Sequence, residues 1–570
     1  MNRMALDDCP RAVGKARAFQ QQRTVMWGVV PWTLCLLQGC NGRDYLEDTA
    51  LPPMELERLR RPALLDPKAE SQEPPVTLAD AVQDAVEVGF GSPTHPVRAT
   101  VSLADVRQWS LEYNLDLSVQ RYNPTLGVTA LDAEAAKFEA VLRGNYTRND
   151  STLVENLESG LPTASDSAKI GVDFPLATGG TINVSTLAIA ADSVLTPEPW
   201  EAGLSVNLSL PLLRGFGIRA NTASIRVAQM EARQIDARTT LEMIRILANA
   251  EKSYWQLFTA RRILEVRERQ HRLAEEQMAR ARRRVDQGDA APIELLRAQS
   301  GVGRTIEQII VADNVLRIRA RSLKRFMNSP QYPVDGPTML DPITASEPFG
   351  LNLDPAALTA LALNNRMDLL ELELQLAVDA ERVALARNEA LPSFTLDYQY
   401  QYLGDAASLG QAYSSLGDSD PFVVSVSGSI PLGNEARKAR LSQAIARRLQ
   451  RLATKESRRQ AITQEVHDVV DTVAGAWRRV VATRLEVTFA ERALLAEQRQ
   501  FDVGLRTSVE VLDAAARLAD AQAREVDASA QYEISLIDLA FATGTVLGAS
   551  QVSLPDPMPR PESVVGWPWE

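Results

Sequence analysis

The sequence predicts a mainly α-helical protein with a smaller β part, and this arrangement occurs twice within one chain. First, helical patterns run from residue 221 almost to Gly288 and from residue 434 to about Val503. The first of these helices would be on the order of 100 Å long. Second, each helix follows a segment of alternating apolar and polar residues, as in a half-buried strand. Third, the order of strand, turn, long helix and returning helix recurs after about two hundred residues.

Composition and charge exclude several classes of function. The chain has 570 residues and a net charge of −12, which argues against a nucleic-acid partner because phosphate binding needs a basic face. The basic runs at 280–284 and 447–459 are interpreted as solvated helix faces. Three cysteines all precede residue 41, and His95, His271 and His467 are scattered. We therefore expect no disulfide framework, no metal site, no cofactor and no enzyme activity.

The N-terminus is typical of an exported bacterial protein. Four basic residues precede the apolar stretch 26–37, which is too short to span a bilayer as a helix. This stretch ends in Leu37-Gln-Gly-Cys40, which resembles a lipobox, although Gln38 departs from the small or apolar residue usual there. We predict a lipoprotein-type signal peptide at 1–39, lipidation of Cys40 and a linker at 40–100. The alternative is an uncleaved or an ordinary signal with a chance cysteine.

The first repeat is predicted at 101–328. Ser102 begins a helix with a near capping box, and further helix extends to about Glu139. Strands are predicted at 140–149, 169–176 and 181–189, the last two joined in a hairpin at Thr178-Gly-Gly180, and residues 150–166 are predicted to be a loop. Leu204 to Leu210 form the strand that enters the long helix. Gly288 suits the helix C′ position and Pro292 the first turn of the returning helix.

The second repeat is predicted at 356–548, after a proline-rich linker at 329–355. Arg366-Met-Asp-Leu echoes the earlier Asn114-Leu-Asp-Leu, and Ile430-Pro-Leu matches Leu210-Pro-Leu. The predicted elements are a strand at 392–403, a loop at 404–420, a strand at 422–430, a long helix to about Val503 and a returning helix at 508–543. Gly504 ends the long helix. The tail at 549–570 is predicted to be irregular.

A heptad-like seam runs along each long helix. Both seams have spacings of 4-3-4-3, which is typical of helices packed nearly parallel over many turns. We predict that the second long helix is about one heptad shorter than the first. The seam positions are Met243, Leu247, Ala250, Tyr254 and Leu257 in the first repeat, and Val466, Val470, Val473, Trp477 and Val480 in the second.

The strands combine an apolar face with a polar one. One chain has too few strands for a soluble sandwich, and in a membrane only closed barrels satisfy the backbone of strands. Alternation of lipid-facing and lumen-facing residues, with tyrosines near the interfaces, is the barrel signature, and Tyr398, Tyr400 and Tyr402 suit that role. Several chains would have to share the barrel. The alternative is a soluble β-hairpin that caps a coiled coil.

These features together resemble the TolC-like outer-membrane efflux family. The resemblance covers about 101–548 and rests on the order of its motifs, twice over. The motifs are Leu208-Ser-Leu-Pro-Leu-Leu-Arg-Gly-Phe-Gly217, Tyr254-Trp255, Val285-Asp-Gln-Gly288 and Phe501-Asp-Val-Gly-Leu-Arg-Thr-Ser-Val-Glu-Val-Leu-Asp513. The family implies a homotrimer with a shared β-barrel in the outer-membrane lipid and an α-helical barrel in the periplasm. It also implies docking onto a periplasmic adaptor (membrane fusion protein) and an inner-membrane pump.

The resemblance also implies a gate at the periplasmic tip, where the helices turn at Gly288 and Gly504. Glu510 and Asp513 match acidic residues that ring the tunnel constriction, and Glu510 stands where the family has aspartate. Arg506 matches a residue that helps to hold the closed state, Phe501 a tip aromatic, and Glu294 an acidic residue after the first turn. Glu510 also completes a capping box with Thr507, and Glu294 lies where a helix dipole favours any carboxylate.

The function predicted from the sequence is a passive outer-membrane exit duct of a tripartite efflux or type I secretion system. Adaptor and pump would open it at the tip. Carboxylates repeated by symmetry there would attract cations and repel anions. The alternative function is that of a structural or adaptor-like periplasmic coiled-coil protein that carries no flux.

Overall fold

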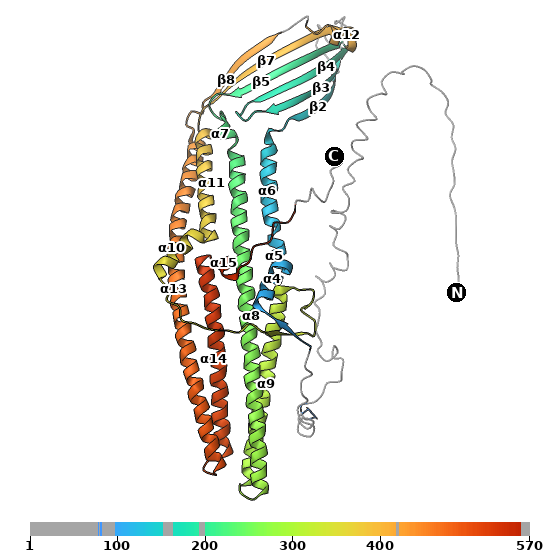
Figure 1. Ribbon diagram of the computed structural model, residues 1–570. Coiled ribbons are helices and arrows are strands. Elements are labelled where there is room, and N and C mark those ends of the chain that lie inside the picture. Colours follow the sequence, from blue (N-terminus) through green and yellow to red (C-terminus); the bar gives the residue numbers. More distant parts are fainter. Residues whose placement is uncertain are drawn as a thin grey trace, which may run out of the picture. The chain divides into compact units, whose positions relative to one another are not determined.

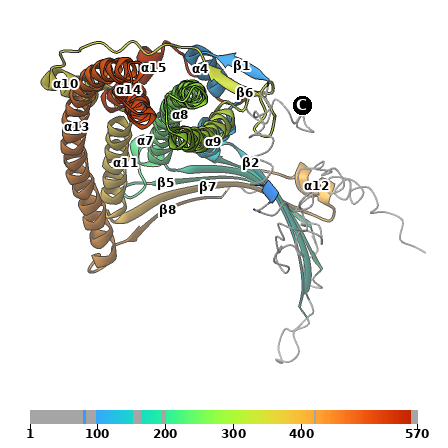
Figure 2. The ribbon, with the colours of Figure 1, turned by 90° about the horizontal axis from the view of Figure 1, so that it is seen from below.

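The two long helices are present as α8 (Ala223–Asp286) and α13 (Glu435–Asp502). The structure is a computed structural model, and it describes residues 78, 80, 81, 97–151, 163–192, 200–417 and 421–559. Cys40, the predicted signal peptide and residues 560–570 lie outside the described residues. Residues 95–570 form one unit, and Figures 1 and 2 show its elements from two directions.

The composition of α8 and α13 explains their length. Neither helix contains proline, and Gly475 is the single glycine in the two of them, so nothing interrupts residues of high helix propensity. The whole seam of α8 is buried, with Leu247, Ala250, Tyr254 and Leu257 fully enclosed. On α13 the seam is buried as far as Val473 and half-buried beyond it. The predicted shortening of the second helix is wrong, because α13 has 68 residues and α8 has 64.

Each repeat begins with short helices, continues into strands and ends in a pair of long antiparallel helices (Figure 1). In the first repeat these elements are α4 (Leu103–Tyr113), α5 (Leu115–Gln120), α6 (Tyr122–Ala135), β2 (Val141–Ser151), β3 (Thr163–Pro175), β4 (Thr181–Asp192), β5 (Trp200–Pro211), α7 (Ile218–Asn221), α8 and α9 (Pro292–Met327). In the second they are α10 (Pro355–Asn365), α11 (Met367–Glu389), β7 (Ser393–Ala406), α12 (Leu409–Ser414), β8 (Phe422–Ser429), α13, α14 (Ser508–Thr543) and α15 (Val546–Ser550).

Six strands form one antiparallel sheet in the order β2-β3-β4-β5-β7-β8. The predicted loop at 150–166 is wrong at both ends, since β2 reaches Ser151 and β3 begins at Thr163. The predicted loop at 404–420 is also too long, because β7 reaches Ala406 and α12 follows it. The hairpin around Gly179 is present, and it lies inside the sheet, between β2 and β5.

The register places apolar residues on one face of all six strands. Cα partners follow one another across the sheet from Leu142 through Val172, Val184, Val206 and Tyr400 to Phe422. One residue further along β3 to β7, the partners are Asp173, Asn183, Asn207 and Gln399. Because side chains alternate along a strand, these rows lie on opposite faces. Figure 1 shows the sheet at the end of the unit opposite the turns after α8 and α13.

The two related four-residue motifs occupy equivalent positions. Asn114 precedes α5, and its side-chain amide donates to the carbonyl of Phe326, one residue before the end of α9 (2.7 Å). Arg366 precedes α11 and donates to the carbonyl of Ala542, one residue before the end of α14 (3.3 Å). Both side chains are buried. In each repeat, therefore, one polar side chain ties the first helices to the C-terminus of the returning helix.

A two-stranded parallel sheet connects the segments before the repeats. β1 (Arg98–Val101) pairs with β6 (Met339–Pro342), and both lie in segments predicted to be linkers. Val101 and Leu340 are fully buried in the main core, with Tyr254 and Met327. Four-residue strands are too short for alternation to identify them.

Within the described residues, no helix combines the length and apolar character needed to cross a membrane.

Equivalent glycines end the two long helices. Gly288 and Gly504 have φ of 83° and 81°. After α8, the amide of Gly288 donates to the carbonyl of Val285 (3.0 Å) and that of Asp289 to the carbonyl of Arg284 (2.8 Å). After α13, the amide of Gly504 donates to the carbonyl of Phe501 and that of Leu505 to the carbonyl of Gln500. These are Schellman caps, which need a left-handed residue at C′.

Alanine at two glycines of α13 and its cap is expected to have opposite effects. Gly504→Ala should destabilise the tip by about 1 kcal/mol, because an L side chain is strained at positive φ. Gly475→Ala should stabilise the helix by about 0.5–1 kcal/mol, because Gly475 is exposed within a helix and an added Cβ meets nothing within 4 Å. Hydrogen exchange of α13 amides measures both. Equal effects of the two variants would contradict the cap assignment.

Candidate functional site

The turns that follow α8 and α13 lie at the same end of the unit (Figure 1). Side chains join the two turns. Glu294, in the first turn of α9, accepts from the hydroxyl (2.6 Å) and the backbone amide (3.3 Å) of Ser508 at the start of α14. Arg284, in the last turn of α8, donates to the carbonyl of Phe501 (3.1 Å). Its guanidinium carbon lies 5.1 Å from the centroid of the Phe501 ring. These contacts connect the helical hairpin α8–α9 to the hairpin α13–α14.

Arg284 corrects one interpretation of the sequence. The run at 280–284 was expected to be a solvated face, and Arg282 and Arg283 are indeed exposed. Arg284 is half-buried and contacts the opposite hairpin. Its partner lies 217 positions away in the chain. A place in the last helical turn suits any cation because of the helix dipole, so the sequence held no signal for this contact.

Phe501 anchors the tip of the second hairpin. Its side chain is 5% exposed and packs with Leu494, Val511 and Ala515, and Leu273 of α8 packs against this cluster. The Phe501 carbonyl accepts from both Gly504 and Arg284. Phe501 therefore takes part in the cap of α13 and in the contact between the hairpins.

Glu294 is held as an anion at this junction. Burial would raise its pKa, but hydrogen bonds from Ser508 and the charge of Arg297 (2.8 Å) outweigh burial and leave the pKa below its usual value. The carboxylate caps the N-terminus of a helix that is not its own. The position of Glu294 in the first turn of α9 predicts a favourable interaction with the dipole of that helix, but it does not predict the contact with Ser508 on the other hairpin.

Glu510 forms the predicted capping box with Thr507 at the start of α14. Its carboxylate accepts from the amide (2.6 Å) and the hydroxyl (3.1 Å) of Thr507. It also lies 3.0 Å from the guanidinium of Arg506. The hydrogen bond from the Thr507 amide is the main cause that lowers the pKa of Glu510, and Arg506 adds to it. Glu510 thus caps α14 and still presents a negative charge.

Arg506 has its described partners within the second hairpin. It donates to Gln500 (2.9 Å) and lies 3.3 Å from Glu497 on α13, in addition to its contact with Glu510 on α14. It thereby closes the turn of its own hairpin. Arg506 and Arg284 both line a cavity of about 180 Å³ between the two turns, together with Glu294 and Phe501.

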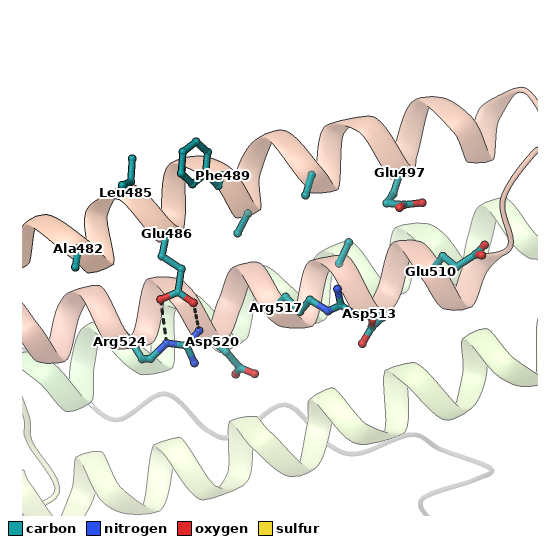
Figure 3. A pocket seen from close by; sticks show the side chains of 13 residues that line it. Ala482, Leu485, Glu486, Phe489, Glu497, Glu510, Asp513, Arg517, Asp520 and Arg524 are labelled. Atoms are coloured by element: carbon teal, nitrogen blue, oxygen red, sulfur yellow. Dashed lines mark hydrogen bonds and ion pairs between the residues drawn. The ribbon is translucent and has the colours of Figure 1, made fainter. Parts of the chain in front are cut away.

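Asp513 lies one turn beyond the cap, and its carboxylate lies 2.5 Å from the guanidinium of Arg517. More than half of its side chain is exposed. Asp513 and Glu510 both line a groove of about 830 Å³ between α13 and α14. Figure 3 shows Glu486, Phe489 and Glu497 on α13 along this groove, opposite Asp513, Arg517 and Arg524 on α14.

The groove is acidic with an apolar strip. It is lined by five carboxylates and two guanidinium groups. Arg524 is paired with Glu486 at 2.5 Å and Arg517 with Asp513. Toward the tip, Glu497 and Glu510 share the single positive charge of Arg506, so one negative charge remains in excess there. Leu485 and Phe489 are both more than half exposed. A lining of this kind favours cations and a basic, partly apolar surface.

The predicted interface tyrosines lie at the opposite end of the unit. Tyr398, Tyr400 and Tyr402 share one face of β7, opposite Leu208, Val206 and Leu204 of β5. The rings of Tyr400 and Tyr402 meet edge to face, with centroids 4.9 Å apart. Tyr398 and Tyr402 are over a third exposed. None of them contributes to the tip.

Comparison with known proteins agrees with this geometry. Residues 141–329 and 358–545 match the family model described as outer membrane efflux protein. The outer membrane protein TolC of Vibrio cholerae serotype O1 is 24% identical over 332 residues, which cover 58% of this chain and 74% of that protein. The outer membrane efflux protein BepC of Brucella suis biovar 1 is 23% identical over 369 residues, which cover 63% of this chain and 75% of BepC.

Solved structures share the fold. The Campylobacter jejuni CmeC outer membrane channel superposes with a TM-score of 0.59 at 13% identity, over 80% of this chain and 91% of that chain. The family match covers most of both repeats, including the six strands of the large sheet, the long helices and the turns at Gly288 and Gly504. This chain therefore belongs to the outer membrane efflux protein family, the TolC-like channels of the outer membrane.

Proposed function

We propose that three copies of this chain form the passive exit duct of a tripartite efflux or type I secretion system. A periplasmic adaptor and an inner-membrane pump open it at the helix turns. The duct supplies a path and no chemistry. The observation that carries the proposal is the six-stranded sheet, which has an apolar face and two open edges.

The two edges are complementary. Among the described strands, β2 pairs only with β3, and β8 only with β7. Five antiparallel steps separate β2 from β8, so these strands run in opposite directions. The β8 edge of one copy can therefore continue the antiparallel ladder on the β2 edge of the next. Closure removes the exposed edges, and the family to which the chain belongs supports three copies.

The two faces of the sheet suit a membrane pore. The row from Leu142 to Phe422 would face lipid, while Asn183, Asn207 and Gln399 would face the lumen. Tyr398, Tyr400 and Tyr402 fit the aromatic level at the membrane interface. The uncovered apolar face argues against a structural periplasmic protein without flux, since such a face needs a cover.

The helix turns are proposed as the gate and as the docking end. Glu510 and Asp513 face a groove open to solvent, and threefold symmetry would repeat their charges around the tunnel. The acidic, partly apolar groove with Leu485 and Phe489 suits a basic, apolar helical segment of the adaptor. Opening separates the hairpins α8–α9 and α13–α14, which breaks the contacts of Arg284 and Glu294.

Ion selectivity provides the test. The protein extracted from outer membranes is expected to form discrete channels in planar bilayers, with preference for cations. Asp513→Asn should lower the cation-to-anion permeability ratio roughly fivefold. A unit charge about 10 Å from an ion in water is worth about 0.4 kcal/mol, which screening in 0.1 M salt reduces to about 0.15 kcal/mol. Three copies of the charge act together, and each acts on cations and anions with opposite sign. Arg517→Gln, its matched control, should raise the ratio by a similar factor.

Two outcomes would contradict the proposal in different ways. A protein without channel activity would overturn the duct. Active channels whose ratio is the same in both variants would leave the duct and remove Asp513 from the gate. Glu510→Gln should also weaken the cap of α14, which hydrogen exchange at the Thr507 amide would report separately.

A further inference from the structure

The hairpin β3–β4 is an insertion into the first repeat. In the second repeat one pair of strands, β7 and β8, lies between α11 and α13. In the first repeat four strands lie between α6 and α8. β2 corresponds to β7, since each follows the rising helix. β5 corresponds to β8, since Leu210-Pro-Leu and Ile430-Pro-Leu follow equivalent strands into the long helices. β3 and β4 have no counterpart among the described residues of the second repeat.

The inserted strands continue both faces of the sheet. Val172 and Val184 lie in the apolar row between Leu142 of β2 and Val206 of β5. Ile182, two residues before Val184 on β4, lies between Phe174 and Leu208. A hairpin outside the wall would not have to keep its apolar residues level with those of its neighbours. The insertion therefore occupies the same environment as the strands on either side.

A polar ladder crosses the insertion on the opposite face. Arg143 of β2 lies 2.6 Å from Asp173 of β3. Asn183 of β4 donates to Asp173 at 2.6 Å, and Asn207 of β5 donates to Asn183 at 3.2 Å. Two residues along the strands, on the same face, the hydroxyls of Ser185 and Ser205 lie 2.8 Å apart. Side chains of four strands thus form one connected network, in which the inserted strands provide the middle members.

The turn of the hairpin is fixed to the start of the long helix. The carbonyl of Thr178 accepts from the amide of Gly217 at 2.9 Å. Asn221 of α7 donates to the carbonyls of Gly215 (2.7 Å) and Gly217 (3.0 Å). A Cβ at Gly179 would lie 2.1 Å from the oxygen of Gly215, and φ there is 100°. Glycine is therefore required, and the insertion is built into the joint between sheet and helices.

We propose that the β3–β4 hairpin widens the membrane pore and sets the size of solute that can leave through it. The inference rests on the proposed trimeric duct. Three chains with six strands each give eighteen strands, and without the insertion they would give twelve. At a strand spacing of about 4.8 Å and a tilt of about 40°, the backbone diameter is roughly 36 Å for eighteen strands and roughly 24 Å for twelve.

The wider pore is an aqueous one. Barrels of sixteen to eighteen strands hold a water-filled channel, whereas small barrels are filled by their own side chains. The polar ladder would line this lumen. The number of long helices per chain is unchanged by the insertion, so the hairpin enlarges the membrane exit and leaves the helical tunnel as it is. We expect the exit to admit hydrated solutes too wide for a twelve-stranded pore.

Deletion of residues 163–192 tests the width. β2 and β5 are antiparallel, because three antiparallel steps separate them, so the remaining residues 152–162 and 193–199 can join them as one loop. Polyethylene glycols of graded size are added to the extracellular side of channels in planar bilayers. The largest polymer that lowers the conductance should be roughly 12 Å smaller in diameter for the deletion variant. The same cutoff in both proteins would overturn the inference.

Thiol labelling of the full-length chain gives a second measurement that does not depend on the deletion variant. In outer-membrane vesicles, Asn183→Cys should react with a water-soluble maleimide, and Val184→Cys should react only with a bilayer-soluble one. Asn207→Cys and Val206→Cys on β5 are the matched controls, and the unsubstituted chain corrects for native cysteines. If the β5 pair differs and the β4 pair does not, the hairpin lies outside the wall. If neither pair differs, the proposed membrane pore itself fails.

Discussion

Arg284→Ala is expected to raise the ratio of open to closed tips about 30- to 700-fold in each subunit. The side chain joins the hairpins α8–α9 and α13–α14 through its hydrogen bond to the Phe501 carbonyl and its position over the Phe501 ring. A hydrogen bond from a charged donor contributes about 1.5–3 kcal/mol, and a cation–π contact about 0.5–1 kcal/mol. If opening breaks both contacts, their loss destabilises the closed state alone, and each 1.4 kcal/mol shifts the ratio tenfold.

Two further variants separate the parts of this contact. Arg283→Ala removes an exposed cation from the adjacent position of the same helix and should leave the ratio within about twofold of the native value. Phe501→Leu keeps the backbone carbonyl and removes the ring, so it should give a smaller rise than Arg284→Ala. Single-channel recordings in planar bilayers measure the open probability directly.

Two other outcomes would contradict a role of the contact between Arg284 and Phe501 in gating. If Arg283→Ala and Arg284→Ala raise the open probability equally, the effect is one of charge in the tunnel and not of the contact with Phe501. If neither changes it, the hairpins do not separate at this point during opening. Hydrogen exchange at Gly504, whose amide donates to the same carbonyl, would show whether the tip has loosened.

The helices and their ends could be predicted because local rules determine them. A 3.6-residue pattern sustained over many turns can only be helix, and Gly288 and Gly504 carry the cap in their own chemistry. Glu510 was recognisable as a capping residue from the spacing Thr507 to Glu510. The repeat was visible because two copies of one pattern reinforce each other.

The strand ends and the links between hairpins could not be predicted in the same way. Residues 163–168 are small and polar, so β3 begins where alternation gives no signal. The order of strands depends on register between distant segments, and neither β1 nor β6 is long enough to show a period. Arg284 and Phe501, like Glu294 and Ser508, meet only through tertiary contact. No local pattern selects such a partner.

Arg366→Ala is expected to destabilise the folded chain by about 2–4 kcal/mol, because it removes the packing of a buried side chain and its charged hydrogen bonds, which contribute about 1.5–3 kcal/mol. The Arg366 side chain is 5% exposed and lies 3.0 Å from Asp368 and 2.8 Å from Glu465. Its removal leaves the half-buried carboxylate of Asp368 with Arg458 alone and frees the carbonyl of Ala542. The midpoint of denaturation in detergent, followed by helical circular dichroism, measures the loss.

Arg382→Ala is the matched control on the same helix. Arg382 is half exposed and pairs with Glu231 at 2.7 Å. Surface pairs contribute about 0–1 kcal/mol, so this variant should remain within about 1 kcal/mol of the native protein. A loss as large as that of Arg366→Ala would mean that any change of charge on α11 destabilises the fold, and that the buried contacts of Arg366 contribute no more than a surface pair.

Acid should weaken the tie between the start of α11 and the end of α14 in the second repeat before it affects the equivalent tie in the first repeat. Burial would raise the pKa of Asp368, but hydrogen bonds and charge from Arg366 and Arg458 outweigh burial and hold it below its usual value. A carboxyl with a lowered pKa stabilises the fold above its unfolded pKa of about 3.9, and this contribution is lost as the pH falls through the folded value. Asp368→Asn should have a lower free energy of unfolding than the native protein at neutral pH, and this difference should shrink below about pH 4.

The first repeat makes the equivalent tie with neutral groups. Asn114 accepts from the Leu117 amide and donates to the Phe326 carbonyl, and neither bond involves a group that titrates. Asn114→Ala should cost about 1–2 kcal/mol as a lost cap, by the same amount below pH 4 as at pH 7. Hydrogen exchange should thus show acid loosening at the start of α11 and none at α5. Equal loosening at both would mean that acid acts on the whole unit, and that the ionic tie at Arg366 is not the element that responds to pH.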